Sequence, residues 1–527
     1  MNKPKFLCLV VLDGWGIAPA GPGNAISLSA TPNMDKFTAN YPHTTLSASG
    51  ESVGLPKNEN GNTETGHLNL GAGRVIYQEL MRINMSIADG SFFENEALKG
   101  AFEHAKKAHS QLHLIGLIGE GGVHSNIGHI FALLQLAKKL SFKNVFLHLF
   151  TDGRDSPTTS AKIYISRVRE VIAKEGLGQI ASIMGRFWGM DRDLRWERTA
   201  KAYFALTKGQ ANLYQTPEGA IEDAYAHGVT DEFIEPAVMT DTAGLPLAQV
   251  QDDDSIIFFN FRVDRPRQLA RAFIIPDFEN NLTEWGAVFN RGEALKNIYF
   301  STMTHYEDIL TASGAKVGFP PEKVEDTLGE IISQNKLRQL RLSESEKEKF
   351  VSYYFNGLND QYPREDRIVI PSPKIATYDL APEMKTKELT MTLIENLKKD
   401  FYSFILVNYA NSDMVAHTGN IGATVKACQV IDENLGRLES FVINHNGVLI
   451  ITADHGNAEE MINPKTGFID TGHSNFPVPF IVVANELSRK PLELGQGILA
   501  DVAPTILRIM NLPIPASMTG KNLLPNL

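Results

Sequence analysis

The chain has 527 residues, of which 43% are hydrophobic, and its formal net charge at pH 7 is -11. A chain of this length can bury two or more cores, which indicates a multidomain protein. The acidic balance excludes a general binder of nucleic acid or membrane surfaces, because such proteins need a surplus of basic surface.

The N-terminal segment and the cysteines indicate a cytoplasmic protein. Residues 6–12 are apolar, but Asp13 ends the run after seven residues, so a buried strand is favoured over a signal peptide. No stretch approaches the roughly 18 apolar residues that span a bilayer. Two distant cysteines, Cys8 and Cys428, give no disulfide framework and suit a reducing compartment.

Short apolar runs rich in β-forming residues recur along the chain. They are residues 6–12, 112–118, 145–150, 256–261, 402–407, 448–451 and 478–483. Helix-like stretches such as residues 160–173 and 388–399 lie between several of them. This alternation predicts an α/β protein with largely parallel sheets.

Two stretches bear on organisation. Residues 338–349 are dense in charge, and for most of these charges we favour a solvated helix face. Residues 304–321 mix polar residues with glycines and prolines, and are the best candidate for a crossing between domains.

Carboxylates and imidazoles gather where the apolar runs end. Asp413 and His417 are four residues apart after one run, so on a helical turn they would share a face. The complete set is Asp13, Asp413, His417, Asp454, His455 and His473. Each alone has a structural explanation, as a turn residue, a surface histidine or a helix cap. Their joint occurrence at strand ends instead favours a mixed O/N site for Mn²⁺, Zn²⁺ or Co²⁺.

A nucleophile is expected in residues 60–74, which are dense in glycine and small polar residues. The hydroxyl of Thr63 is the best candidate, because a coordinated cation can activate a weak alcohol nucleophile. Thr63 also suits the start of a helix, and a helix N-terminus attracts phosphate.

Arginines stand beside aspartates after three further apolar runs. They are Arg154, Arg186, Arg192, Arg262 and Arg265. Arginine forks match phosphate and carboxylate oxygens, so these clusters predict a small, doubly anionic substrate, with ordinary surface ion pairs as the alternative. His124 and Asp155 are candidate acid/base groups for a substrate hydroxyl.

Several long motifs resemble the cofactor-independent phosphoglycerate mutases, a branch of the alkaline phosphatase superfamily. The resemblance runs from residues 12–16 through 66–74, 152–155 and 370–379 to 454–457 and 472–474, nearly the whole chain. It implies an alkaline-phosphatase-like α/β domain, residues 1–76 and 311–527, which binds metal. A second α/β domain, residues 77–310, would be inserted into it, bind substrate and face the first across a cleft.

The resemblance also implies roles for single residues. One metal ion would be held by Asp413, His417 and His473, and the other by Asp13, Thr63, Asp454 and His455. The substrate would be bound by His124, Arg154, Asp155, Arg186, Arg192, Arg262, Arg265 and Lys347. Among these groups Thr63, Asp155 and Lys347 would be catalytic.

The implied reaction interconverts 3-phosphoglycerate and 2-phosphoglycerate in glycolysis through a phospho-Thr63 intermediate. It needs two divalent ions, with Mn²⁺ expected and Mg²⁺, Co²⁺ or Zn²⁺ as alternatives, and no 2,3-bisphosphoglycerate. The family also suggests a monomer. Thr63 stands where most members have serine, and Thr65, Ser412 and Ala416 also depart from the usual motif residues.

Other functions are compatible with parts of the pattern. A metal-dependent phosphatase or phosphodiesterase would share the ligand set, although the arginine clusters argue against it. A sulfatase would need a modified cysteine or serine at position 63, and a pentose-phosphate mutase should lack residues 152–155 and 262–265 in this arrangement. A metal-binding protein without catalysis is the alternative from outside the enzymes.

Overall fold

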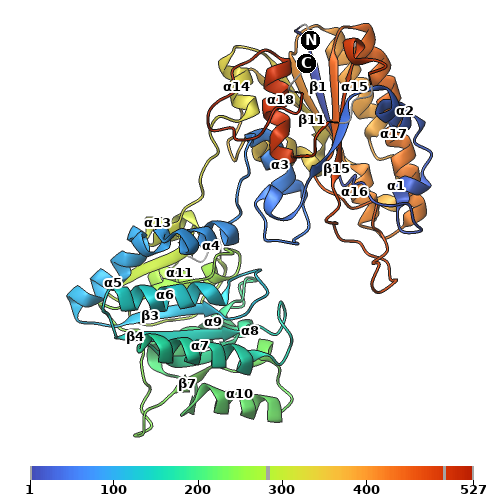
Figure 1. The fold of residues 1–527 in the computed structure, drawn as a ribbon. Coiled ribbons are helices and arrows are strands. Elements are labelled where there is room, and N and C mark those ends of the chain that lie inside the picture. The colour runs from blue at the N-terminus through green and yellow to red at the C-terminus, as the bar shows by residue number, and fades with distance from the viewer. Residues whose placement is uncertain (1–2, 281–284, 491–493, 525–527) are drawn as a thin grey trace. The chain divides into compact units, whose positions relative to one another are not determined.

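The computed structural model describes residues 3–280, 285–490 and 494–524. The chain divides into two compact units, of which unit 1 comprises Met1–Gln78 and Glu322–Leu527 and unit 2 comprises Glu79–Pro321. Within the described ranges, none of the helices combines the length and apolar character that crossing a membrane requires. Figure 1 shows a sheet covered by helices in each unit, which confirms the predicted α/β class.

Unit 1 contains an eight-stranded sheet in the order β12-β11-β13-β1-β14-β15-β2-β16 among the described residues. Its strands are β1 (Leu7–Leu12), β2 (His43–Ser47), β11 (Gln339–Glu344), β12 (Glu365–Ile370), β13 (Phe404–Tyr409), β14 (Val448–Thr452), β15 (Val478–Ala484) and β16 (Gly497–Ile498). The five strands from β12 to β14 run parallel, and β15 is antiparallel to both its neighbours. Strand β1 is apolar throughout because helices cover both faces of the sheet.

Two groups of helices cover the sheet of unit 1 (Figure 1). One group is α3 (Thr63–Ala72), α14 (Leu328–Gln334) and α18 (Val502–Ile509). The other is α1 (Ala25–Leu28), α2 (Pro32–Asn40), α15 (Thr386–Lys398), α16 (Asn411–Ala416) and α17 (Ile421–Asn444). A continuous core of buried aliphatic and aromatic side chains lies between these helices and the sheet.

Unit 2 contains a second eight-stranded sheet in the order β10-β9-β8-β3-β4-β5-β7-β6 among the described residues. Its strands are β3 (Leu112–Leu117), β4 (Val145–Thr151), β5 (Gln179–Gly185), β6 (Asn212–Tyr214), β7 (Ala237–Met239), β8 (Ser255–Phe258), β9 (Tyr299–Thr304) and β10 (Lys316–Phe319). All pairings are parallel except that of β5 with β7.

The helices of unit 2 pack on two separate cores, one on each side of its sheet. They are α4 (Glu79–Asp89), α5 (Glu96–Ala108), α6 (Ile127–Lys139), α7 (Ala161–Glu175), α8 (Arg186–Gly189), α9 (Trp196–Lys208), α10 (Pro217–Ala226), α11 (Pro266–Ile274) and α13 (Asp308–Ala312). Side chains of α6 and α7 belong to one core, and side chains of α9 and α11 belong to the other.

The structure corrects two expectations about organisation. The second boundary was expected at 310/311, but unit 2 extends to Pro321, because β10 pairs in parallel with β9. The second expectation, a solvated helix face for most charges of residues 338–349, holds only in part. Residues 339–344 are the buried strand β11, hydrogen-bonded between β12 and β13, whereas Glu346, Glu348 and Lys349 are exposed in the helical turns that follow. Arg341 of β11 is buried against the rings of Phe355 and Phe404, so charge alone was a poor guide to exposure there.

Candidate metal centre and arginine site

The carboxyl ends of the parallel strands of unit 1 bring most of the predicted metal ligands together. Asp13 follows β1, Asp454 follows β14, and α16 after β13 carries Asp413. Parallel strands place their carboxyl ends along one edge of a sheet, so residues far apart in sequence become neighbours there. Among the described residues, three groups have donor atoms within 4.8 Å of one another: Asp413 with His417 and His473, Asp13 with His67 and Asp454, and Asp13 with Asp413 and His455.

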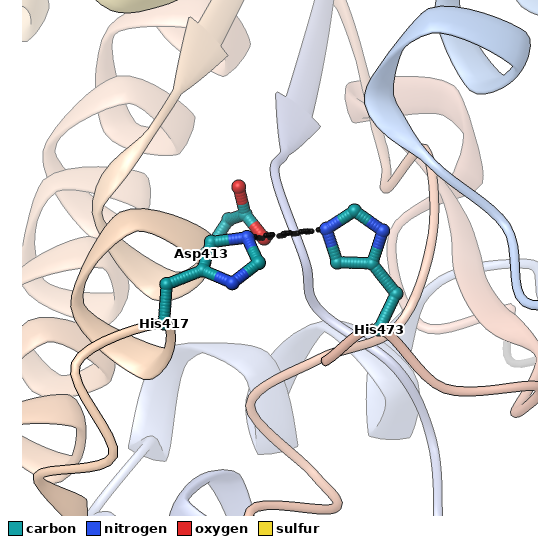
Figure 2. A group of neighbouring side chains, drawn as sticks. All are labelled: Asp413, His417 and His473. Carbon is teal, nitrogen blue, oxygen red and sulfur yellow. Dashed lines mark hydrogen bonds and ion pairs between the residues drawn. The ribbon is translucent and has the colours of Figure 1, made fainter. Parts of the chain in front are cut away.

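The first group is formed by Asp413, His417 and His473, whose side chains point toward one another in Figure 2. The Nδ1 atom of His417 lies 2.7 Å from the carbonyl oxygen of Thr471, and that of His473 lies 2.8 Å from the carbonyl oxygen of Gly61. A carbonyl oxygen can only accept, so both Nδ1 atoms donate. In the neutral rings, the lone pairs of both Nε2 atoms are therefore left for a ligand.

The two Nε2 atoms converge. They lie 3.2 Å apart, and both are near Oδ1 of Asp413, at 3.2 Å for His417 and 3.5 Å for His473. Two imidazole lone pairs facing each other beside a carboxylate repel unless a positive charge lies between them. This donor set fits a divalent cation, which accepts both imidazole nitrogen and carboxylate oxygen.

A second cluster, formed by Asp13, Asp454 and His455, combines residues of the other two groups. Thr63 lies beside this second cluster, at the first position of helix α3. The Asn62 side chain caps this helix by accepting from the backbone N–H of Thr65. The Thr63 hydroxyl oxygen is 2.9 Å from Nε2 of His455, 3.2 Å from Nζ of Lys347 and 3.4 Å from Oδ1 of Asp13. The candidate nucleophile therefore points into the ligand cluster.

Lys347 is buried among the carboxylates. Its Nζ donates to Oδ1 of Asp13 and to Oδ2 of Asp413, both at 2.8 Å. Burial by itself lowers the pKa of Lys347, but the charges of Asp13, Asp413 and Asp454 outweigh it and raise the pKa above the usual range. Lys347 is thus a permanent cation within hydrogen-bonding distance of the Thr63 oxygen.

Two further features of the second cluster favour a bound cation: an oxygen of Asp454 and the proton of the His455 ring. Oδ2 of Asp454 is buried and accepts no hydrogen bond, although the rings of His67 and His455 lie 3.2 and 3.6 Å away, so a coordinated cation would give this oxygen a bonding partner. Burial lowers the pKa of His455, but Asp454 and Asp13 outweigh it and raise the pKa to about 10. A cation bound there would take the place of that proton.

Three buried residues at this centre were not predicted as site residues. His67 contacts Oδ2 of Asp454 at 3.2 Å through Nδ1, and the Asn408 amide donates to Asp13 at 2.7 Å. The Asn457 amide donates to Oδ1 of Asp413 at 2.8 Å. Each of the three lies within or beside a sequence motif, but the motif does not indicate which side chain the residue contacts.

Unit 2 brings four of the predicted arginines to one cavity of about 270 Å³. Arg154, Arg186, Arg192 and Arg265 line it, together with Arg195 and Arg198, which were not predicted. The lining also contains the carboxylates of Asp191, Asp193 and Glu232, and aspartates outside the lining pair with Arg186 and Arg192. Burial, reinforced by Arg186 and Arg192, lowers the pKa of Arg265. Guanidinium groups gathered this closely around one cavity suit a small anion.

The remaining predicted residues of unit 2 lie in an ion-pair network joined to this cavity. Arg186 donates to Asp152 at 2.6 Å and to Asp155. The ring of His124 lies 3.8 Å from Asp155 and 3.7 Å from Asp264. Arg192 donates to Asp264 at 2.6 Å and Arg262 does so at 3.1 Å.

The network decides the charge of the two candidate acid/base groups. Burial and the nearby Arg186 lower the pKa of His124 to about 4, so the ring is neutral at pH 7. Burial raises the pKa of Asp155, but its hydrogen bond with Arg186 outweighs burial and the net pKa is lowered. Asp155 is therefore ionised and can accept a hydrogen bond from a hydroxyl.

Fold and site together define an α/β protein with a carboxylate–imidazole centre suited to divalent cations and a separate arginine cavity suited to a small anion. Comparison with known proteins narrows this class. The family model described as "BPG-independent PGAM N-terminus" matches residues 83–308. A 2,3-bisphosphoglycerate-independent phosphoglycerate mutase of Moorella thermoacetica is 47% identical, with 99% of each chain covered, and one of Chloroflexus aggregans is 46% identical with the same coverage.

A solved structure agrees with these relatives. The crystal structure of Leishmania mexicana phosphoglycerate mutase at low cobalt concentration is 30% identical, covers 99% of this chain and 98% of its own, and gives a TM-score of 0.61. The chain belongs to the family of 2,3-bisphosphoglycerate-independent phosphoglycerate mutases.

Proposed function

We propose that the protein interconverts 3-phosphoglycerate and 2-phosphoglycerate by phosphoryl transfer through Thr63, with two divalent cations and without 2,3-bisphosphoglycerate. The observation that carries the proposal is the position of the Thr63 hydroxyl, which faces His455, Lys347 and Asp13. The names of the full-length relatives supply the substrate. The same proposal includes a monomer, as the family resemblance suggests, and a role in glycolysis. It also includes a cytoplasmic location, which the two free, buried cysteines support.

We assign one cation to Asp413, His417 and His473, and the other to Asp13, Thr63, Asp454 and His455. The converging imidazole lone pairs of the first set support this assignment, as does the buried Asp454 oxygen of the second set, which accepts no hydrogen bond. Mn²⁺ is the proposed ion, and Mg²⁺, Co²⁺ and Zn²⁺ suit the same donors. When bound, such cations supply positive charge that activates a hydroxyl and stabilises phosphoryl oxygens.

We assign metal binding to unit 1 and recognition of the substrate to unit 2. Arg154, Arg186, Arg192, Arg262 and Arg265 would bind the carboxylate and phosphate oxygens, because guanidinium forks match both groups. His124, neutral at pH 7, would hydrogen-bond a substrate hydroxyl, as would the ionised Asp155.

The chain's own residues account for the transfer. The Thr63 oxygen forms a bond to phosphorus while the bond from phosphorus to the 3-oxygen breaks, leaving phospho-Thr63 and glycerate. The proton that the Thr63 hydroxyl loses in this step ends on the 3-oxygen. Glycerate then reorients, its 2-oxygen loses a proton and takes the phosphoryl group, and the Thr63 oxygen is protonated again. Over the cycle one proton moves from the 2-oxygen to the 3-oxygen, and Asp155 carries it. Lys347 stabilises the charge that develops on the transferred group.

Removal of divalent cations is the first test. We expect protein treated with EDTA and then dialysed to lose isomerisation of 3-phosphoglycerate, and added Mn²⁺ to restore it without bisphosphoglycerate and with little release of free phosphate. Isomerisation and phosphate are measured in the same samples. Phosphate release without isomerisation would make the protein a phosphatase, and inactivity with Mn²⁺, Mg²⁺, Co²⁺ and Zn²⁺ would refute the proposal.

The arginine cavity gives a second test. We expect Arg265→Ala to raise KM for 3-phosphoglycerate by roughly 10- to 100-fold, because a hydrogen bond to a charged group contributes about 1.5–3 kcal/mol. The matched control is Arg169→Ala, which removes an exposed arginine paired with Glu218 on the surface of the same unit. Steady-state kinetics of both variants are compared with wild type. Equal KM values for the two variants would show that Arg265 does not bind the substrate.

A further inference from the structure

Glu459 is a buried carboxylate next to the metal centre to which no role has been given. It lies after β14 in the loop that carries Asp454 and His455, and its side chain is 3% exposed. Its Oε2 atom accepts from the backbone N–H groups of Gly16 and Asn457, both at 2.9 Å. Its Oε1 atom accepts from the hydroxyl of Ser474.

These three donors belong to three different loops, and each loop carries proposed cation ligands. Gly16 lies in the loop that begins with Asp13, after β1. Asn457 is two residues after His455, and Ser474 directly follows His473. One carboxylate therefore connects the segments that hold Asp13, His455 and His473.

Two glycines make room for this carboxylate. A Cβ atom at Gly16 would lie 2.2 Å from Cδ of Glu459, and one at Gly456 would lie 2.2 Å from its Oε1. No side chain fits at either position while the carboxylate is in place, so the loops are shaped around it. The backbone N–H of Ser474 also donates to the carbonyl oxygen of Gly456 at 2.9 Å. This hydrogen bond keeps the loop of His455 in contact with the loop of His473.

The connection extends to a fourth ligand. The Asn457 backbone is held by Glu459, while its side-chain amide donates to Oδ1 of Asp413 at 2.8 Å. We propose that Glu459 is a positioning residue, which sets the spacing of cation ligands on separate loops by receiving one donor from each loop. This inference rests on the proposed function only for its assignment of the ligands.

The test is the affinity for Mn²⁺ alone, measured from the EPR signal of free Mn²⁺ in a titration of cation-free protein. We expect Glu459→Ala to weaken Mn²⁺ binding roughly 10- to 100-fold, the usual effect of losing a residue that orients metal ligands. Glu459→Gln should recover most of the affinity. Its amide oxygen can still accept from the two backbone groups, and the Ser474 hydroxyl can reverse to accept from the amide nitrogen.

Asp432→Ala is the matched control. Asp432 is equally buried in unit 1, on α17, and accepts from the backbone N–H groups of Asn33 at 3.1 Å and Met34 at 2.8 Å. Its loss should lower the melting temperature of the cation-free protein without changing Mn²⁺ affinity. If Asp432→Ala weakened Mn²⁺ binding as much as Glu459→Ala, or if neither variant changed it, the proposal would be overturned.

Activity and folding are controlled separately. Glu459→Ala should regain most of its turnover at saturating Mn²⁺, because only the positions of the ligands are affected. If Glu459→Ala does not fold, Ser474→Ala removes the hydrogen bond of Glu459 to the His473 loop and keeps the backbone bond between Gly456 and Ser474. It should still weaken Mn²⁺ binding, whereas unchanged affinity would contradict the proposal. Wild type that binds Mn²⁺ but does not isomerise phosphoglycerate would refute the proposed function and leave the affinity comparison intact.

Discussion

Replacing Thr63 with alanine is expected to abolish isomerisation, with turnover reduced by roughly 10⁴-fold or more, as when a covalent nucleophile is deleted. The Thr63 oxygen is within 3.4 Å of His455, Lys347 and Asp13, and the variant lacks this oxygen. Mn²⁺ affinity should fall far less than turnover, because Asp13, Asp454 and His455 remain. Turnover and Mn²⁺ binding are measured on the same preparation.

Thr63→Ser is the control for this prediction. It keeps the hydroxyl and removes the methyl group that restricts the side-chain torsion, so activity should persist with an altered rate. Brief exposure to 3-phosphoglycerate labelled with ³²P, followed by acid quench, should label wild type and Thr63→Ser but not Thr63→Ala. A Thr63→Ala protein that keeps turnover within tenfold of wild type would exclude the phospho-Thr63 route.

Replacing Lys347 with methionine is expected to have the second largest effect, on both stability and activity. Lys347 is 3% exposed and donates to Asp13 and Asp413, so its loss leaves buried carboxylates without their counter-charge. Breaking a buried ion pair on one side costs about 3–5 kcal/mol. The cation-free variant should therefore melt well below wild type, and Mn²⁺ should raise its melting temperature more than it raises that of wild type.

The activity of Lys347→Met should fall by roughly 10²- to 10³-fold even at saturating Mn²⁺, because the charge beside the Thr63 oxygen is lost. Calorimetry with EDTA or Mn²⁺ and kinetics at saturating Mn²⁺ measure the two effects. Lys385→Met is the control, since Lys385 forms a partly exposed pair with Glu388 that contributes little. If Lys347→Met kept the melting temperature and turnover of wild type, Lys347 would have no role at this site.

Much of the fold followed from local sequence patterns. Each of the seven apolar runs contains or overlaps a strand, and the stretches 160–173 and 388–399 correspond to α7 and α15. The apolar runs and the helix-like stretches can both be recognised from residues that are neighbours in the sequence. A strand buried on both faces, for example, must be apolar throughout. The clustering of Asp13, Asp413 and Asp454 also followed, since parallel strands place their carboxyl ends together.

The errors occurred where distant packing overrides local composition. Arg341 lies in a charged stretch, yet the rings of Phe355 and Phe404 and the amide oxygens of Gln339 and Asn356 accommodate it in the interior. The boundary near residue 310 was placed too early because β10 is a short strand, defined by its pairing with β9 more than by its own residues.

The sequence by itself determined the α/β class, most strands and the candidate ligands, because periodicity and strand-end chemistry are local properties of the chain. Only the tertiary structure decided which side chains contact those ligands. His67 meets Asp454, Asn408 meets Asp13, and Glu459 joins Gly16 to Ser474 across hundreds of residues. Such contacts depend on strand order and on the space left by individual glycines, and both are set by packing between segments that are distant in the sequence.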